Sequence, residues 1–107
     1  RSITYAQDKV GIVTDNVEGG DPYKLRIYDR EGSPVFEKTF NYQYTGFDID
    51  GDLVLLYNDS SCKVYNMTGT EKYNGTFDFT VSKVSAGRFP GTLLVMGPQK
   101  MTEIKLQ

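Results

Sequence analysis

Four aspartates gathered around one glycine are the residues whose types and spacing most resemble a site for chemistry. They are Asp48, Asp50, Asp52 and Asp59, in the stretch FDIDGDLVLLYND at residues 47–59. A calcium-binding EF-hand loop takes oxygen ligands from its positions 1, 3, 5 and 12 and needs glycine at position 6. Counted from Asp48, the aspartates fall on all four ligand positions, so a calcium site is the first hypothesis to weigh.

The residues around the aspartates fit a turn between two strands better than a metal loop. Leu53 occupies the position that needs glycine, and Gly51 comes two positions too early. The run LVLLY that follows is typical of a buried strand, which cannot wrap around an ion. Asp50-Gly51 is also a strong signal for a hairpin turn. The sequence therefore predicts no metal site, and Asp48, Asp50 and Asp52 remain the only candidates for one.

The acidic residues do not indicate an enzyme either. The chain has no histidine, which removes the commonest general base and the Ser-His and Cys-His nucleophile pairs. A glycosidase would need only two carboxylates, roughly 5 to 9.5 Å apart. Nearly every acid here, however, lies at an expected turn or on the polar face of an expected strand, where carboxylates are usually solvated. We therefore expect no catalytic residue, no cofactor and no enzymatic activity.

Composition and charge narrow the possible partners. The chain has 107 residues and a net charge of −2, with basic residues scattered among acidic ones, so it lacks the concentrated positive surface that nucleic-acid binding needs. Its single cysteine, Cys62, is expected to be a small buried side chain. No apolar run approaches the roughly 18 residues of a membrane span. The start at Arg1 is compatible with the removal of an export signal or anchor.

Apolar and polar residues alternate along most of the chain, a pattern that predicts strands and no helix. In YKLRIYD, Tyr23, Leu25 and Ile27 point to one side, while Lys24 and Arg26 point to the other. Tyrosine, phenylalanine and β-branched residues, which favour strands, are frequent. Turns and strands must therefore position every candidate residue.

The strands belong to an internal repeat. LRIYDREGSPVFEKTF (25–40) aligns with CKVYNMTGTEKYNGTF (62–77) at an offset of 37 residues. In both, Asp or Asn is followed three residues later by Gly, which favours a type I turn. GIVTD (11–15) matches LLYND (55–59) at an offset of 44, because the first copy has the longer loop VEGGDP (17–22).

A third copy begins with LLVMG (93–97), which aligns with LVLLY at an offset of 40. The apolar runs of these second strands are expected to be covered on both faces. The third copy ends after three strands, which predicts an unpaired sheet edge near residues 101–106. The strands are expected near residues 2–7, 10–14, 23–29, 34–40, 44–49, 52–58, 62–66, 70–77, 81–86, 92–96 and 101–106.

Four strands in about 40 residues is the period of a β-propeller blade, and the motif of IYDREGSPVF and VYNMTGTEKY resembles the blade repeats of the PQQ-like and WD40-like propeller superfamily. The chain has no tryptophan, so it departs from the Trp-Asp dipeptide of WD40 repeats and from the tryptophan-docking motif of quinoprotein blades, and this argues against a bound quinone. It also resembles, more loosely, a family of unknown function from Gram-positive bacteria in which such blades follow an N-terminal membrane anchor.

These patterns predict an all-β fold of antiparallel four-stranded blades in about two and three-quarter copies, spanning approximately residues 2–40, 44–77 and 81–106. The chain, residues 1–107, is then a single all-β domain or a fragment of a larger propeller, since a ring typically has 4 to 8 blades. A β-sandwich or barrel that arose from a duplicated hairpin is the alternative.

A blade segment without catalytic residues is expected to bind a protein or glycan through the loops at its edges, and open blade edges also favour self-association. The inserted loop VEGGDP and the nearby Tyr23, Tyr42 and Tyr44 are the candidate contact residues, because tyrosine is frequent at interfaces. Two alternatives stay open: a structural segment that completes a larger ring, and part of a propeller hydrolase whose active site lies elsewhere. The resemblance to an anchored family implies an extracellular or cell-surface location.

Overall fold

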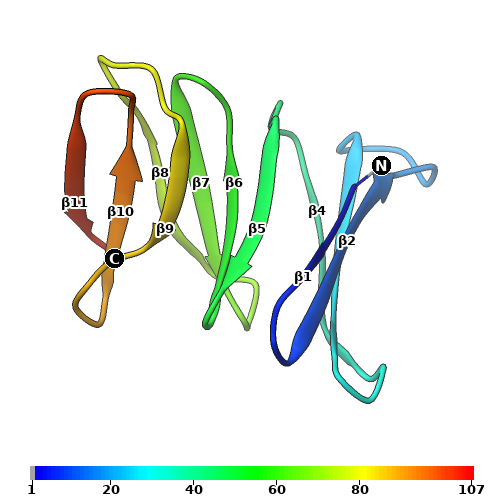
Figure 1. Ribbon diagram of the computed structural model, residues 1–107. Coiled ribbons are helices and arrows are strands. Elements are labelled where there is room, and N and C mark those ends of the chain that lie inside the picture. Colours follow the sequence, from blue (N-terminus) through cyan, green and yellow to red (C-terminus); the bar gives the residue numbers. More distant parts are fainter. Residues whose placement is uncertain (1) are drawn as a thin grey trace.

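Eleven strands form the regular structure of residues 2–107, the part of the chain that the structure describes. In this computed structural model they make three antiparallel sheets placed face to face in a row, with the two termini at opposite ends of the row (Figure 1). The strands are β1 (Ser2–Tyr5), β2 (Lys9–Asp15), β3 (Tyr23–Asp29), β4 (Pro34–Phe40), β5 (Gly46–Asp50), β6 (Leu53–Tyr57), β7 (Ser61–Asn66), β8 (Glu71–Thr76), β9 (Lys83–Ala86), β10 (Thr92–Met96) and β11 (Met101–Lys105).

Each sheet is a meander in which strands adjacent in the sequence are adjacent in space. The first sheet has the order β1-β2-β3-β4, the second β5-β6-β7-β8 and the third β11-β10-β9. The second sheet lies between the others, since β5 contacts β1 and β6 contacts β9. The predicted all-β fold of antiparallel blades is confirmed, and three sheets in a row exclude the alternative sandwich or barrel. Within residues 2–107, no helix is long and apolar enough to cross a membrane.

The same turn joins the third and fourth strands of the first two sheets. Oδ1 of Asp29 accepts hydrogen bonds from two following amides at 3.0 and 2.9 Å, and the Gly32 amide donates to the Asp29 carbonyl. Asn66 makes the same two contacts, at 3.0 and 2.9 Å, with Gly69 in the place of Gly32. The two glycines have φ angles of 86° and 80°, which glycine adopts without steric cost. The turn predicted from the repeat is thus confirmed in both sheets.

Two apolar cores hold the three sheets together. The first junction, between the first and second sheets, buries Val13, Leu25, Ile27, Phe40, Ile49, Val54, Leu56 and Tyr65. The second junction, between the second and third sheets, buries Leu53, Leu55, Cys62, Val64, Val81, Val84, Leu93 and Val95. Because successive residues of β6 point to opposite faces, this strand contributes two residues to each core. The second sheet is therefore covered on both faces.

The third sheet is shifted by one residue from the alignment predicted above. Leu93 packs in the second junction, on the face of its sheet that Val54 occupies in the second sheet. The structural offset is therefore the 39 residues that separate Val54 from Leu93, and not 40. Since a shift of one residue moves every side chain of a strand to the other face, the counterpart of Leu55 is Leu94.

The outer face of the third sheet is uncovered. In β10 only Leu93 and Val95 are buried, whereas Leu94 and Met96 are partly exposed. The prediction that both second strands are covered on both faces is correct for β6 and wrong for β10. The reason is that no fourth sheet packs against the third within residues 2–107.

Truncation of the counterparts Leu55 and Leu94 tests this difference. Leu55→Ala is expected to lower the free energy of unfolding by about 2 to 5 kcal/mol, because it leaves a cavity in a closed core. Leu94→Ala is expected to cost less than about 1.5 kcal/mol, because a partly exposed side chain on an uncovered face leaves no closed cavity. Denaturant unfolding at low protein concentration measures both, and equal losses would contradict the uncovered face.

Candidate binding surface on the first sheet

One face of the first sheet packs on the second sheet, and the other, named here the open face, does not. Two of its apolar side chains are well exposed, Ile3 at 54% and Tyr5 at 71%. The strand registers place the following residues on the open face: Ile3, Tyr5, Val10, Ile12, Thr14, Lys24, Arg26, Tyr28 and Glu37.

The apolar half of the open face is built like a contact between two blades. It carries five apolar or aromatic residues, Ile3, Tyr5, Val10, Ile12 and Tyr28. Their counterparts in the second sheet all pack in the first junction, and those in the third sheet all pack in the second junction. The same pattern of side chains thus packs against a preceding sheet in the second and third sheets, whereas in the first sheet no sheet packs on it within residues 2–107. The counterparts are Phe47, Ile49, Val54, Leu56 and Tyr65 in the second sheet, and Val84, Ala86, Leu93, Val95 and Ile104 in the third.

A shallow groove of about 610 Å³ crosses the open face. Its floor is the apolar pair Ile3 and Ile12, which face each other across β1 and β2. Tyr28 and Arg26 line the side nearer to β4. The groove therefore offers an apolar strip with one cation beside it.

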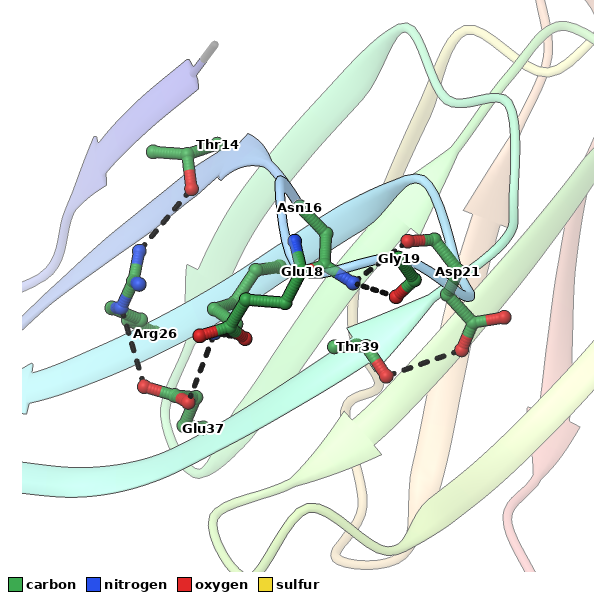
Figure 2. A network of polar contacts seen from close by, with 9 residues as sticks. Thr14, Asn16, Glu18, Gly19, Asp21, Arg26, Glu37 and Thr39 are labelled. Atoms are coloured by element: carbon green, nitrogen blue, oxygen red, sulfur yellow. Dashed lines mark hydrogen bonds and ion pairs between the residues drawn. The ribbon is translucent and has the colours of Figure 1, made fainter.

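The polar half of the open face is a network of ion pairs and hydrogen bonds (Figure 2). Arg26 donates from Nε to Glu37 at 3.2 Å and from Nη1 to the Thr14 hydroxyl at 3.2 Å. Nζ of Lys24 lies 2.6 Å from Glu18 and 3.5 Å from Glu37. Lys24 is only 6% exposed, because the 16–22 loop folds over its side chain. Two cations and two carboxylates thus neutralise one another on this half of the face.

Hydrogen bonds within the inserted loop place Glu18 over the sheet. The Asn16 side chain donates to the carbonyls of Gly19 at 3.0 Å and Asp21 at 2.9 Å (Figure 2). Its backbone amide donates to Pro22 at 2.8 Å, which closes the loop at its base. Asn16 is therefore the residue that gives the loop its shape.

The ion pair between Lys24 and Glu18 shifts both pKa values. The hydrogen bond from Lys24 lowers the pKa of Glu18 below its usual 4.5, and the same bond raises the pKa of Lys24 above 10.5. The contribution of Glu18 is present above pH 4.5 and is lost as the pH falls through the lowered pKa. The contribution of Lys24 is present below pH 10.5 and is lost as the pH rises through the raised pKa. The contact is therefore complete throughout the neutral range.

The three predicted contact tyrosines lie in or beside the first junction and are half-buried. The rings of Tyr23 and Tyr44 meet edge to face with centroids 5.8 Å apart, and Tyr42 lies apart from them, its hydroxyl 2.7 Å from Ser61. The Tyr44 hydroxyl is 2.8 Å from that of Ser2. The structure thus brings Tyr23 and Tyr44 together and shows that all three also serve packing; their role in binding stays a prediction.

The three candidate metal ligands point to different partners. Asp50 accepts a hydrogen bond from the Ala86 amide at 2.8 Å, and Asp48 lies 3.7 Å from Lys83. Asp52 is exposed in the two-residue turn between β5 and β6, where Gly51 has a φ of 62°. Among residues 2–107, no three His, Cys, Asp or Glu side chains are grouped so that they could hold a metal ion.

Cys62 lies in the second junction with no exposed surface. Burial raises the pKa of its thiol to about 12. Because the thiolate is the reactive form, this thiol is inert in the folded protein. Its role is packing, as its sequence context predicts.

Comparisons with known proteins identify the fold. Residues 1–106 match a protein family described as a family of unknown function (DUF5711). No curated protein matches the chain. Among solved structures, the crystal structure of HIRA(644-1017) resembles the chain with a TM-score of 0.67 at 12% identity, over 94% of this chain and 32% of that chain. The chain thus spans about a third of that structure's length, and the likeness shows WD40-like β-propeller blades.

Removing the charge of Glu18 should loosen the loop without unfolding the protein. At neutral pH, Glu18→Gln is expected to reduce the hydrogen-exchange protection of the Asn16 amide. The melting temperature should stay nearly unchanged, because Glu18 is itself exposed and the buried Lys24 keeps Glu37 as a partner at 3.5 Å. The parent chain should lose this protection only below pH 4.5, as Glu18 becomes protonated. Glu31→Gln is the matched control, because no ion pair of Glu31 is found within residues 2–107. Equal protection in both variants would contradict this role of Glu18.

Calcium titration followed by calorimetry tests the interpretation of the aspartates as turn residues. We predict no saturable heat at micromolar to millimolar calcium, because Asp48, Asp50 and Asp52 do not converge. Stoichiometric binding that is lost in Asp50→Ala would show that the aspartates rearrange around an ion.

Proposed function

We propose that this chain, which belongs to the family of unknown function DUF5711, acts as a non-enzymatic interaction module of β-propeller type. It binds a protein partner through the open face of its first sheet. The observation that carries the proposal is an apolar face on which Ile3 and Tyr5 are well exposed and Val10, Ile12 and Tyr28 are partly exposed. The repeat counterparts of all five residues pack in or against a junction between sheets. Large apolar surfaces of this kind mark protein interaction sites.

The partner that fits best is a second copy of the chain. In both junctions, the face that covers the counterparts of the open face belongs to the preceding sheet. The third sheet presents a face of that type at the other end of the row, with Leu94, Met96 and Met101 on it. Contact between the third sheet of one copy and the first sheet of another would continue the row of blades.

Charge is compatible with the same pairing, although Glu103 already pairs with Arg88 at 3.0 Å and Arg26 already pairs with Glu37 at 3.2 Å. Glu103 lies on the outer face of β11, at the repeat position of Val64 in β7 and Ile27 in β3. In the first junction, Ile27 packs in one core with Tyr65, the counterpart of Tyr28. The proposed contact therefore places the carboxylate of Glu103 level with Tyr28 and its neighbour Arg26.

The proposed module has no enzymatic activity and lies outside the cell or at its surface. The lack of histidine supports a binding role over catalysis. A glycan partner has less support than a protein, because the tyrosines that would stack on a sugar also pack in or beside the first junction. We place the module outside the cell or at its surface, which rests on the sequence resemblance to an anchored family.

Light scattering across a concentration series tests the second copy as partner. The molar mass is expected to rise from 12.1 kDa toward twice that value with increasing concentration. Ile12→Lys on the open face and Leu94→Lys on the third sheet should each hold the chain at the monomer mass, because a charge is then buried in the contact. Glu31→Lys is the matched control, since Glu31 is exposed in the turn between β3 and β4 and is not one of the residues of the open face.

A mixture of the two lysine variants distinguishes the head-to-tail contact from other dimers. The Ile12→Lys chain keeps an intact third sheet and the Leu94→Lys chain keeps an intact open face, so the mixture should form a dimer through one contact. A parent chain that stays monomeric at every concentration, or a mixture that stays monomeric while the parent dimerises, would overturn the proposed pairing.

A further inference from the structure

A cleft of about 500 Å³ opens between the second and third sheets, at one end of the second junction. It lies at the end of the sheets that carries the β5–β6 and β9–β10 turns (Figure 1). One wall comes from the second sheet, with Asn66 at the end of β7 and Lys72 in β8, and the other wall is the turn at residues 86–92. Leu53 and Leu106 add apolar surface. The cleft therefore combines polar and apolar walls.

A bulge turns Lys72 toward this cleft. The register between β7 and β8 shifts, so that Lys72 is the extra residue between Glu71 and Tyr73, and such a bulge re-aims a side chain. The first sheet has the same shift between β3 and β4, where the extra residue is Val35 and packs against the core of the first junction. Lys72 thus places a cation where the equivalent position of the first sheet has an apolar side chain.

The β9–β10 turn is a second departure from the repeat. Ile49 and Val54, which pair across the β5–β6 turn, are five positions apart, whereas the equivalent pair Ala86 and Leu93 is seven positions apart. The turn of the third sheet is therefore two residues longer. Packing of the strands does not require this length, because the second sheet closes the same hairpin with the shorter turn.

The longer turn holds Arg88 and Phe89 in fixed positions at the cleft. The carboxylate of Glu103 accepts hydrogen bonds from the backbone amide and from Nη2 of Arg88, both at 3.0 Å. The carbonyl of Phe89 accepts hydrogen bonds from the hydroxyl of Thr92 at 2.6 Å and from its amide at 3.2 Å. The side chain of Phe89 is nevertheless 63% exposed. An arginine and an aromatic ring that are held in place are typical contact residues of protein interfaces, because little conformational freedom is lost on binding.

Charge in the cleft favours an anionic ligand. Lys72 and Arg88 both line it, and no ion pair of Lys72 is found within residues 2–107. Asn66 uses its side-chain oxygen within its own turn, so its side-chain nitrogen is left as a donor. The acid that lines the cleft is Asp52, which β7 separates from Lys72. Donors therefore predominate near Lys72, where a carboxylate fits.

We propose that this cleft binds an acidic segment of a partner protein. A carboxylate of the segment lies between Lys72 and Arg88, and an apolar side chain next to it packs against Phe89. Charge-assisted hydrogen bonds of this kind are a general means of recognising acidic motifs. The cleft lies between two sheets of the chain and shares no residue with the open face, so the inference does not depend on the proposed function.

Two capped peptides, SFEFS and its neutral counterpart SFQFS, are the probes. At millimolar concentration, SFEFS should cause saturable NMR shifts of the Arg88 Nε–H signal and the Asn66 side-chain amide, with an affinity that exceeds that of SFQFS and falls with added salt. Lys72→Ala should weaken binding of SFEFS by roughly two- to fivefold, the worth of an exposed ion pair, and leave SFQFS unchanged. Lys100→Ala is the matched control and should bind as the parent does, since Lys100 is an exposed lysine in the β10–β11 turn at the opposite end of the third sheet (Figure 1).

Further variants separate charge recognition from apolar packing and from self-association. Lys72→Glu should bind the peptide SFKFS better than SFEFS, whereas Phe89→Ala should weaken SFEFS and SFQFS by the same factor. Ile12→Lys, which is expected to stay monomeric, should bind SFEFS as the parent does, so a failure of the proposed pairing leaves this test intact. Equal affinities of SFEFS and SFQFS, unchanged affinity in Lys72→Ala, or the same shifts at the same concentration of acetate alone would overturn the inference.

Discussion

The structure depends on one constraint: a sheet that is apolar on both faces needs a cover on each side. The second sheet meets this condition, because Val54 and Leu56 reach one core while Leu53 and Leu55 reach the other. The outer sheets meet it on one side only. The first and third sheets therefore differ from the second because each lacks a neighbouring sheet on one side within residues 2–107. The alternation of side chains is similar in all three sheets. The two faces proposed to join copies of the chain are the places where this condition is unmet.

Local sequence predicted the elements of the fold well. The turns at Asp29 and Asn66 could be placed in advance because a carboxylate or amide followed by glycine fixes the turn through bonds between near neighbours in the chain. Strand positions followed from alternation for the same reason. The one-residue error in the third copy arose where neither signal applies: apolar residues run consecutively from Leu93 to Met96, and such a run fits either register equally well.

The candidate surface was harder to predict from the sequence, because its parts come from separate segments. Alternation indicated that Lys24 and Arg26 share a face, but their pairing with Glu18 depends on the shape of the inserted loop. The tyrosines near this loop were chosen for their type alone, and Tyr23 and Tyr44 meet inside a junction. Comparison of equivalent positions in the three repeats could have predicted the open face. Once the register is correct, the open face is identified by residues that pack against a preceding sheet in the second and third copies and against no sheet in the first copy.

The position of Cys62 has a consequence for how the stability of the chain can be followed. Its thiol is shielded twice, by the packing of the second junction and by a pKa of about 12. A thiol reagent can reach it only when the second and third sheets separate or the chain unfolds. No other cysteine competes for the reagent. The rate at which Cys62 is labelled therefore measures how often the second junction opens. The measurement needs no change to the sequence.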